Sequence, residues 1–183
     1  MTLIASPVSL QEMFDIKPHI LLHENPGDVS EAEFEAMLAR VPEFRREKAL
    51  RFRFFKDRVL SVLAYRLLTD GLKEFYGIEC PGAFGYNEYG KPYLQDHAGI
   101  HFSLSHCDKA VGCAIWNHPV GLDVEVIENS DVEAAKIWTR KEAYVKLTGT
   151  GISDGFPDII IPENIIFDTT ILEGVVCTVA YKL

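Results

Sequence analysis

Residues 121–126, with the sequence GLDVEV, constrain the fold more than any other stretch of the chain. Apolar side chains alternate there with two carboxylates, Asp123 and Glu125, which is the pattern of a β-strand with one buried face. Successive strand side chains point to opposite faces, so the two carboxylates share one face. Like charges on one face repel each other, and each resists losing its water. Two explanations are open. In one, this is an edge strand whose polar face is solvated or paired with lysine across the sheet. In the other, a bound cation lies beside the two carboxylates.

The bulk properties are those of an ordinary globular protein. The chain has 183 residues, of which 48% are hydrophobic and 25% charged, enough for one domain or two small, tightly packed halves. No apolar run is long enough to cross a bilayer, and the N-terminus lacks a secretory pattern. The four cysteines lack metal-ligand spacing, so we expect free thiols, a cytoplasmic location and no membrane association.

The net charge of −9 argues against nucleic acid as a partner, but the charge is unevenly distributed. Eight of the 18 lysines and arginines lie within residues 40–58. A local basic segment on an acidic protein indicates a small anionic ligand or one acidic docking surface. The alternative is a solvated helix face.

The hydrophobic periodicity and the turn signals predict short strands and a few helices. A capping box formed by Ser30 and Glu33 predicts a helix start, and Asp57 and Gly77 are the expected N-cap and stop of a long buried helix. The helices are expected at about 30–40, 57–75 and 131–148, and the strands at 19–22, 84–86, 92–94, 100–104, 110–116, 120–126, 164–168 and 175–181. The order suggests two similar halves that meet near residue 118.

The last helix carries a third carboxylate. Within WTRKEAYVK, residues 138–146, Trp138, Glu142 and Val145 fall along one stripe, and Lys146 lies one turn beyond Glu142. We expect Glu142 to emerge from a packed face that Trp138 anchors. Three carboxylates would give oxygen donors suited to Mg²⁺, whereas zinc would require histidine or cysteine.

Two further motifs precede the acidic strand: GKPYL, residues 90–94, and FSLSH, residues 102–106. Each is weak by itself, because a lysine before proline is usually a surface residue and a Ser-His pair is usually a turn cap. In order, however, GKPYL, FSLSH, GLDVE and WTRKEAYVK resemble the 4′-phosphopantetheinyl transferases of the surfactin-synthetase-activating, Sfp-like type. The resemblance runs over residues 42–151.

The resemblance implies a fold and an activity. The fold is two similar α+β halves, here residues 1–117 and 118–183, with coenzyme A in the cleft between them. The activity is Mg²⁺-dependent transfer of the phosphopantetheine arm of coenzyme A to a serine of an apo acyl or peptidyl carrier protein, which releases adenosine 3′,5′-bisphosphate. The chain would then be a holo-acyl-carrier-protein synthase, and we expect a monomer because one chain holds both halves.

The resemblance also assigns residues. It makes Asp123, Glu125 and Glu142 the Mg²⁺ ligands, and gives catalytic roles to Glu142 and Lys146. The coenzyme A contacts would come from Arg45, Lys48, Arg58, Lys91, Ser105 and His106.

The chain departs from the family in two places. Leu60 stands where the family usually has arginine, and Arg58 would point elsewhere on a helix. Only twelve residues separate Glu125 from Trp138, where the family usually has a longer segment that helps to receive the carrier. This shortening motivates one alternative, a non-catalytic binder of coenzyme A or carrier protein. A different metal-dependent phosphoryl enzyme, such as a pyrophosphohydrolase, is another, but no helix bears the acidic run it would need.

Overall fold

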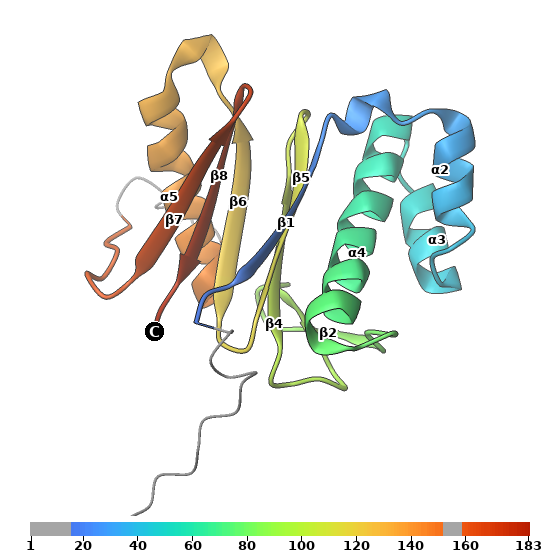
Figure 1. Ribbon diagram of the computed structural model, residues 1–183, viewed down its shortest axis with the longest axis horizontal. Coiled ribbons are helices and arrows are strands. Elements are labelled where there is room, and N and C mark those ends of the chain that lie inside the picture. The colour runs from blue at the N-terminus through green and yellow to red at the C-terminus, as the bar shows by residue number, and fades with distance from the viewer. Residues whose placement is uncertain (1–15, 152–158) are drawn as a thin grey trace, which may run out of the picture.

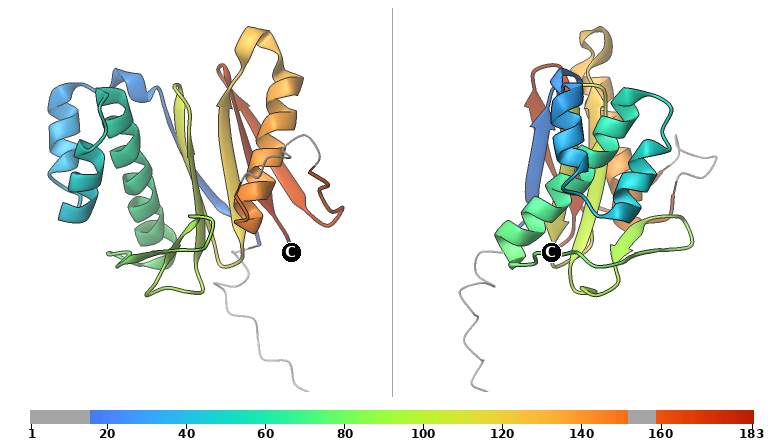
Figure 2. Two further views of the ribbon diagram at one scale, coloured as in Figure 1. Left: turned by 180° about the vertical axis from the view of Figure 1, so that it is seen from behind. Right: turned by 90° about the vertical axis from the view of Figure 1, so that its right-hand side faces the viewer.

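The computed structural model describes residues 16–151 and 159–183, and Figure 1 shows its elements. Two three-stranded antiparallel sheets lie between helix α5 on one side and helix α4 on the other (Figures 1 and 2). A short two-stranded hairpin stands apart from both sheets. The predicted mixture of helices and sheets is confirmed.

The first sheet has the strand order β1-β5-β4. Its strands are β1 (His19–Glu24), β4 (His101–His106) and β5 (Ala110–Trp116), and its covering helix is α4 (Phe55–Tyr76). Apolar side chains of α4 pack on this sheet; Leu68 and Leu72, for example, join Phe102 and Ile115 in one cluster. Helices α2 (Glu31–Leu38) and α3 (Glu43–Leu50) pack on the outer side of α4.

The ends of these helices test three predictions. The capping box of α2 is confirmed, since the Ser30 side chain accepts from the Glu33 backbone N–H and the Glu33 carboxylate accepts from Ser30. The prediction that Asp57 caps α4 is wrong, because α4 begins at Phe55 with Phe54 at the cap position. Asp57 lies in the first turn, where a carboxylate still favours the helix dipole. Gly77 ends α4 in the left-handed conformation, as predicted.

The second sheet has the strand order β6-β8-β7. Its strands are β6 (Val120–Val126), β7 (Ile166–Leu172) and β8 (Val175–Tyr181), and its covering helix is α5 (Val132–Thr148). Asp131 caps the start of the helix, where its side chain accepts from the Ala134 N–H, and Gly149 caps its end. Between α4 and β4 in sequence, β2 (Phe84–Tyr86) and β3 (Pro92–Leu94) form the separate hairpin.

The two sheets share a core. Ala114 and Trp116 of β5 contact Leu122 and Val124 of β6 and the apolar residues of β8 in one buried cluster. Leu122 and Val124 thus face this core, as the alternation in GLDVEV predicts, but the opposite face is buried as well at Asp123, which is only 2% exposed. A division into halves at residues 1–117 and 118–183 stays a prediction, and residues 1–15 of the first half lie outside the described residues.

Two expectations from composition can be checked against the structure. All four cysteines, Cys80, Cys107, Cys113 and Cys177, are free thiols. Within the described ranges, no helix combines the length and the apolar character that a bilayer-spanning segment needs.

Candidate functional site

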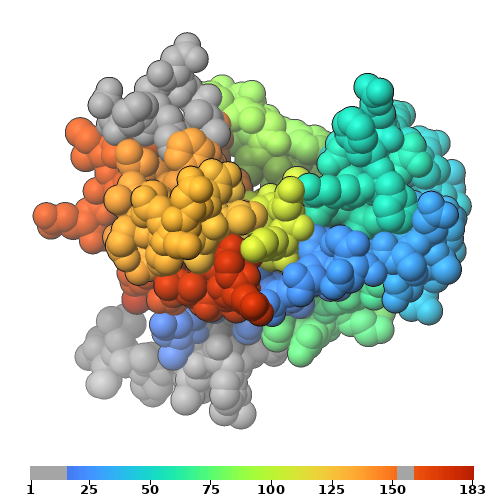
Figure 3. Space-filling view, turned by 90° about the horizontal axis from the view of Figure 1, so that it is seen from above, coloured from blue at the N-terminus to red at the C-terminus, as the bar shows by residue number. Residues whose placement is uncertain are grey.

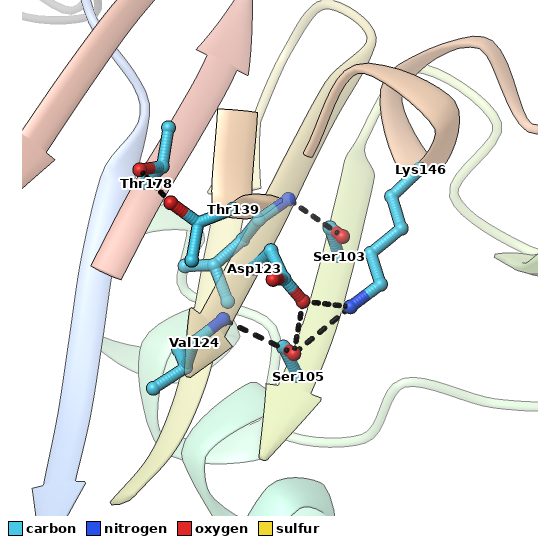
Figure 4. A network of polar contacts seen from close by, with 8 residues as sticks. Ser103, Ser105, Asp123, Val124, Thr139, Lys146 and Thr178 are labelled. Atoms are coloured by element: carbon cyan, nitrogen blue, oxygen red, sulfur yellow. Dashed lines mark hydrogen bonds and ion pairs between the residues drawn. The ribbon is translucent and has the colours of Figure 1, made fainter. Parts of the chain in front are cut away.

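Asp123 lies at the centre of the polar cluster that the sequence singles out. It stands on β6 and is only 2% exposed. Its Oδ1 accepts from Lys146 Nζ at 2.6 Å and from Ser105 Oγ at 2.9 Å (Figure 4). Its Oδ2 is buried and has no hydrogen-bond partner among the described residues. Strand β6, helix α5 and strand β4 therefore each contribute one side chain to this point.

The charge of Asp123 affects the pKa values of Glu125 and Glu142. Burial raises the pKa of Glu142, the Asp123 carboxylate raises it further, and Lys146 opposes the shift. Burial likewise raises the pKa of Glu125, with Asp123 and Glu142 adding to the rise, while Lys146 and a hydrogen bond with Trp138 lower it. The Asp123 charge thus makes the ionised forms of Glu125 and Glu142 less favourable, and Glu142 does the same to Glu125.

The sequence leaves open which cation lies beside the acidic face of β6, and the structure gives part of the answer. Among the residues that the structure describes, no group of three or more histidine, cysteine, aspartate or glutamate side chains is arranged to hold a metal ion. The cation in contact with Asp123 is the ammonium of Lys146. The chemistry of the donor set nevertheless fits a hard divalent cation, because three carboxylates repel one another and Asp123 Oδ2 has no hydrogen-bond partner among the described residues.

The packed face of α5 differs from the prediction. Trp138 is 48% exposed and does not anchor that face. The fully buried residues are Thr139 and Ala143, and the Thr139 hydroxyl lies 2.8 Å from the Thr178 hydroxyl of β8 (Figure 4). Because residues four apart share a face, the helix is rotated from the expected stripe by about one position. Glu142 remains on the buried side, at 8% exposure.

The two serines of FSLSH have a role that the sequence does not reveal. Ser103 Oγ accepts from the Leu122 N–H at 2.9 Å, and Ser105 Oγ accepts from the Val124 N–H at 3.3 Å. These N–H groups lie on the edge of β6 that β8 does not occupy, so the hydroxyls of β4 supply the acceptors that a strand edge otherwise lacks. Alternate serines on a buried strand were the available signal.

Two adjoining pockets lie beside this cluster. One, of about 340 Å³, is lined by the hairpin turn, by β4 and by Glu142 and Lys146 of α5. The other, of about 330 Å³, is lined by Arg45, Lys48 and His106 among others. Four residues line both pockets, so they are continuous: Gly90, Pro92, Phe102 and Leu104.

The space-filling view shows this arrangement from above. In Figure 3 the basic segment, in cyan and teal, and the start of α5, in orange, flank the turn between β4 and β5, in yellow-green. The two pockets show that the basic segment, and Glu142 and Lys146 of α5, border a continuous hollow.

Arg45 lines the second pocket, and one of its guanidinium donors has no hydrogen-bond partner among the described residues. Its Nη2 donates to the Ser61 carbonyl at 2.9 Å, and its guanidinium lies 4.9 Å from the Tyr65 ring centroid. Its Nε is buried without a hydrogen-bond partner among the described residues, and burial lowers the pKa of Arg45. A buried guanidinium with a free donor can accept an anion such as a phosphate.

Of the other residues predicted to contact coenzyme A, some line the two pockets and others do not. His106 lines the second pocket, and burial, with the charge of Lys146, lowers its pKa. Arg58 lines neither of the two pockets, and its Nε donates to the Phe52 carbonyl at 2.8 Å. Lys91 lines the first pocket, but its ammonium donates to two backbone carbonyls. The phosphate roles of these side chains stay predictions.

Comparison with known proteins gives a consistent result. No protein-family model matches the chain. A 4′-phosphopantetheinyl transferase of Bacillus subtilis is 28% identical over 151 residues, which cover 68% of this chain and 67% of the relative. The 4′-phosphopantetheinyl transferase gsp of Aneurinibacillus migulanus is 30% identical, over 69% of this chain and 64% of the relative. The 4′-phosphopantetheinyl transferase Sfp of Bacillus subtilis strain 168 is 26% identical, over 68% and 67%.

This chain is a relative of the Sfp-type 4′-phosphopantetheinyl transferases. The resemblance that the four motifs indicate is thereby confirmed. All these relatives are named as transferases of the phosphopantetheinyl group. The matched part of the chain spans about two thirds of the length of each of the three relatives.

Proposed function

We propose that the chain transfers the 4′-phosphopantetheine arm of coenzyme A to a serine of an apo acyl or peptidyl carrier protein, with Mg²⁺ as the metal. One observation carries the proposal. Asp123, Ser105 and Lys146 converge from three elements, and the charge of Asp123 helps to raise the pKa of both Glu125 and Glu142. The names of the relatives support the same reaction.

Coenzyme A would lie in the hollow between the two predicted halves. Arg45 and Lys48 border one end of that hollow and would hold phosphate groups of the nucleotide. Glu142 borders the other end, and together with Asp123 and Glu125 of β6 it would hold Mg²⁺. When bound, the ion supplies positive charge that neutralises the pyrophosphate oxygens.

The transfer itself requires one bond to form and one to break. The carrier serine oxygen attacks the β-phosphorus of coenzyme A, and the bond from that phosphorus to the bridging oxygen breaks. Adenosine 3′,5′-bisphosphate leaves. Lys146, whose ammonium already faces Asp123, would stabilise negative charge on the departing oxygens. Glu142, or a water that Glu142 orients, would accept the serine proton.

Mass spectrometry of a carrier protein tests the proposal directly. The chain, coenzyme A, Mg²⁺ and an apo carrier protein are mixed, and the carrier is examined for the added arm. We expect the arm on a serine side chain of the carrier, and its loss when EDTA replaces Mg²⁺. Absence of the arm from fatty-acid, polyketide and peptide-synthesis carriers would contradict the proposal.

A non-catalytic binder is the second candidate, because the connection from β6 to α5 is tight. A single 3₁₀ turn, Glu128–Ser130, fills it, and Asn129 and Ser130 both have positive φ angles. Tight binding of coenzyme A without transfer to any carrier would favour this candidate. For the transferase, a monomeric state and a cytoplasmic location stay predictions. Size-exclusion chromatography tests the oligomeric state.

A further inference from the structure

The turn between β2 and β3 is docked onto the C-terminal end of α5. The Asn87 side-chain oxygen accepts from the backbone N–H groups of Tyr89 and Lys91, at 3.0 and 2.8 Å, and so fixes the turn locally. The Asn87 amide nitrogen donates to the Gly149 carbonyl at 2.8 Å. One side chain thus shapes the turn and attaches it to the end of the helix.

Lys91 extends this attachment to a second element. Its Nζ donates to the Leu147 carbonyl in the last turn of α5 and to the Val120 carbonyl at the start of β6, each at 3.2 Å. The last carbonyls of a helix lack partners within the helix, and a positive charge near them is favourable. Lys91 is therefore placed to cap α5 and to tie its end to β6. Burial lowers the pKa of Lys91 to about 8.

The elements that Lys91 joins lie in close contact. A Cβ at Gly121 of β6 would collide with the Ala143 carbonyl and the Leu147 backbone of α5. A Cβ at Gly149 would lie 3.0 Å from both Asn87 Nδ2 and Lys91 Cδ. The end of α5 is held between the backbone of β6 and the hairpin turn, with no room for it to shift without breaking these contacts.

The joined elements carry the reactive cluster. Helix α5 bears Glu142 and Lys146, the latter directly before Leu147, and β6 bears Asp123. A displacement at the end of α5 changes the position of Lys146 relative to Asp123. A misplacement of about 1 Å at a catalytic group can cost roughly a hundredfold in rate.

We propose that Lys91 is a positioning residue that acts through α5 and β6, and that it does not contact a phosphate of coenzyme A. Its two hydrogen bonds set the separation of the helix and the strand that carry the acidic cluster. The kinetic part of this inference rests on the proposed transferase function, whereas the structural part does not.

Lys91→Met tests the inference, because methionine keeps an unbranched side chain and removes the donors. Hydrogen exchange of residues 144–149 should become about tenfold faster, since the end of α5 loses its cap. In the transfer reaction, kcat should fall about tenfold with KM for coenzyme A changed less than about twofold, the pattern of a lost alignment in the transition state. Lys91→Arg, which can donate to both carbonyls, should restore most of both quantities.

The matched control is Lys73→Met on the exposed surface of α4, which should leave the exchange of residues 144–149 and the kinetics unchanged. The opposite pattern for Lys91→Met would overturn the inference: a KM for coenzyme A raised about tenfold and less dependent on salt than in the wild type, with kcat and the exchange unchanged. That pattern indicates a phosphate contact. If the wild-type chain transfers nothing, the proposed function fails, but hydrogen exchange still decides whether Lys91 caps the helix.

Discussion

Asp123 holds two hydrogen bonds on one oxygen and none, among the described residues, on the other. Replacing it with asparagine keeps the size and the acceptor for Ser105 but removes the negative charge. We expect Asp123→Asn to lower transfer by about a thousandfold or more, as the loss of a group that acts in the transition state does. Mass spectrometry of the carrier measures the transfer, and far-UV circular dichroism should show an unchanged fold.

The charge of Asp123 also acts on its neighbouring carboxylates. Without it, the pKa values of Glu125 and Glu142 should move back toward the ordinary range, because Asp123 contributes to raising both. Transfer close to the wild-type rate in Asp123→Asn would refute the placement of the site.

Arg45 offers a second test on single residues. Arg45→Ala removes the buried guanidinium from the pocket that Lys48 and His106 share. We expect KM for coenzyme A to rise about tenfold, which corresponds to one charge-assisted hydrogen bond, and the wild-type dependence of KM on salt to weaken because one cation is gone. Arg51, exposed and paired at most weakly with Glu47, is the matched control. Equal KM values for Arg45→Ala and Arg51→Ala would clear Arg45 of ligand binding.

The sequence predicts some of these residue positions and not others, for physical reasons. The alternation in GLDVEV determines the face of Asp123 and Glu125, because a strand allows only two faces. The direction of Trp138 depends on which helix residues meet β8, and the sequence of α5 alone does not settle that. The partners of Lys91 are backbone carbonyls distant in sequence, which no side-chain pattern reports.

At the scale of elements, the contact between α5 and β6 decides the geometry of the site. Gly121→Ala would force a Cβ into the Ala143 carbonyl, which is backbone and cannot rotate away. We expect a loss of about 3 kcal/mol or more in the free energy of unfolding, at the upper end of the cost of overpacking. Urea denaturation measures this value.

Gly99→Ala is the matched control for that substitution. A Cβ there meets no heavy atom within 4 Å, so the free energy of unfolding should change by less than about 1 kcal/mol. Similar values for the two variants would show that α5 does not rest on the backbone of β6 in solution.

The elements themselves were largely predictable, and their junctions were not. A period of 3.6 residues identifies helices locally and β6 alternates with a period of two, but β5 and β8 are buried throughout and are recognisable only as short apolar runs between turn signals. The link between β4 and β6 depends on serine hydroxyls that meet the N–H groups of Leu122 and Val124. Ser103 and Ser105 are compatible with a turn cap as well as with this link, so the pattern alone leaves the choice open.

At the scale of the whole molecule, buried thiols make stability depend on pH. Burial, with the charges of Asp123 and Cys107, raises the pKa of Cys177 to about 12. The unfolded thiol ionises near pH 9 while the folded thiol stays protonated, so the stability it contributes is full below pH 9 and falls as pH rises above 9. The slope is at most about 1.4 kcal/mol per pH unit.

Urea denaturation between pH 8 and 10.5 measures this dependence. Cys177→Ala should lower the free energy of unfolding at every pH and also flatten its decline above pH 9. Cys80 is exposed, so Cys80→Ala should keep the wild-type slope. Identical slopes in all three proteins would mean that the Cys177 thiol titrates normally.

The core that joins the sheets bears on whether the predicted halves are independent. The cluster of Ala114, Trp116, Leu122 and Val124 draws on β5 from one predicted half and on β6 from the other. Burial of this apolar surface is available to neither sheet alone. The halves at 1–117 and 118–183 should therefore unfold together even if they are similar in architecture.

Leu122→Ala tests this cooperativity. Leu122 is fully buried in the shared cluster, so the substitution should cost about 2 to 5 kcal/mol. If the halves unfold as one unit, native-state hydrogen exchange should show the same loss of protection in α4 and in α5. Leu50→Ala, at a position 46% exposed, should change neither helix's protection appreciably. Wild-type protection in α4 with a loss confined to α5 would instead mean that the first sheet and its helices are stable without the second.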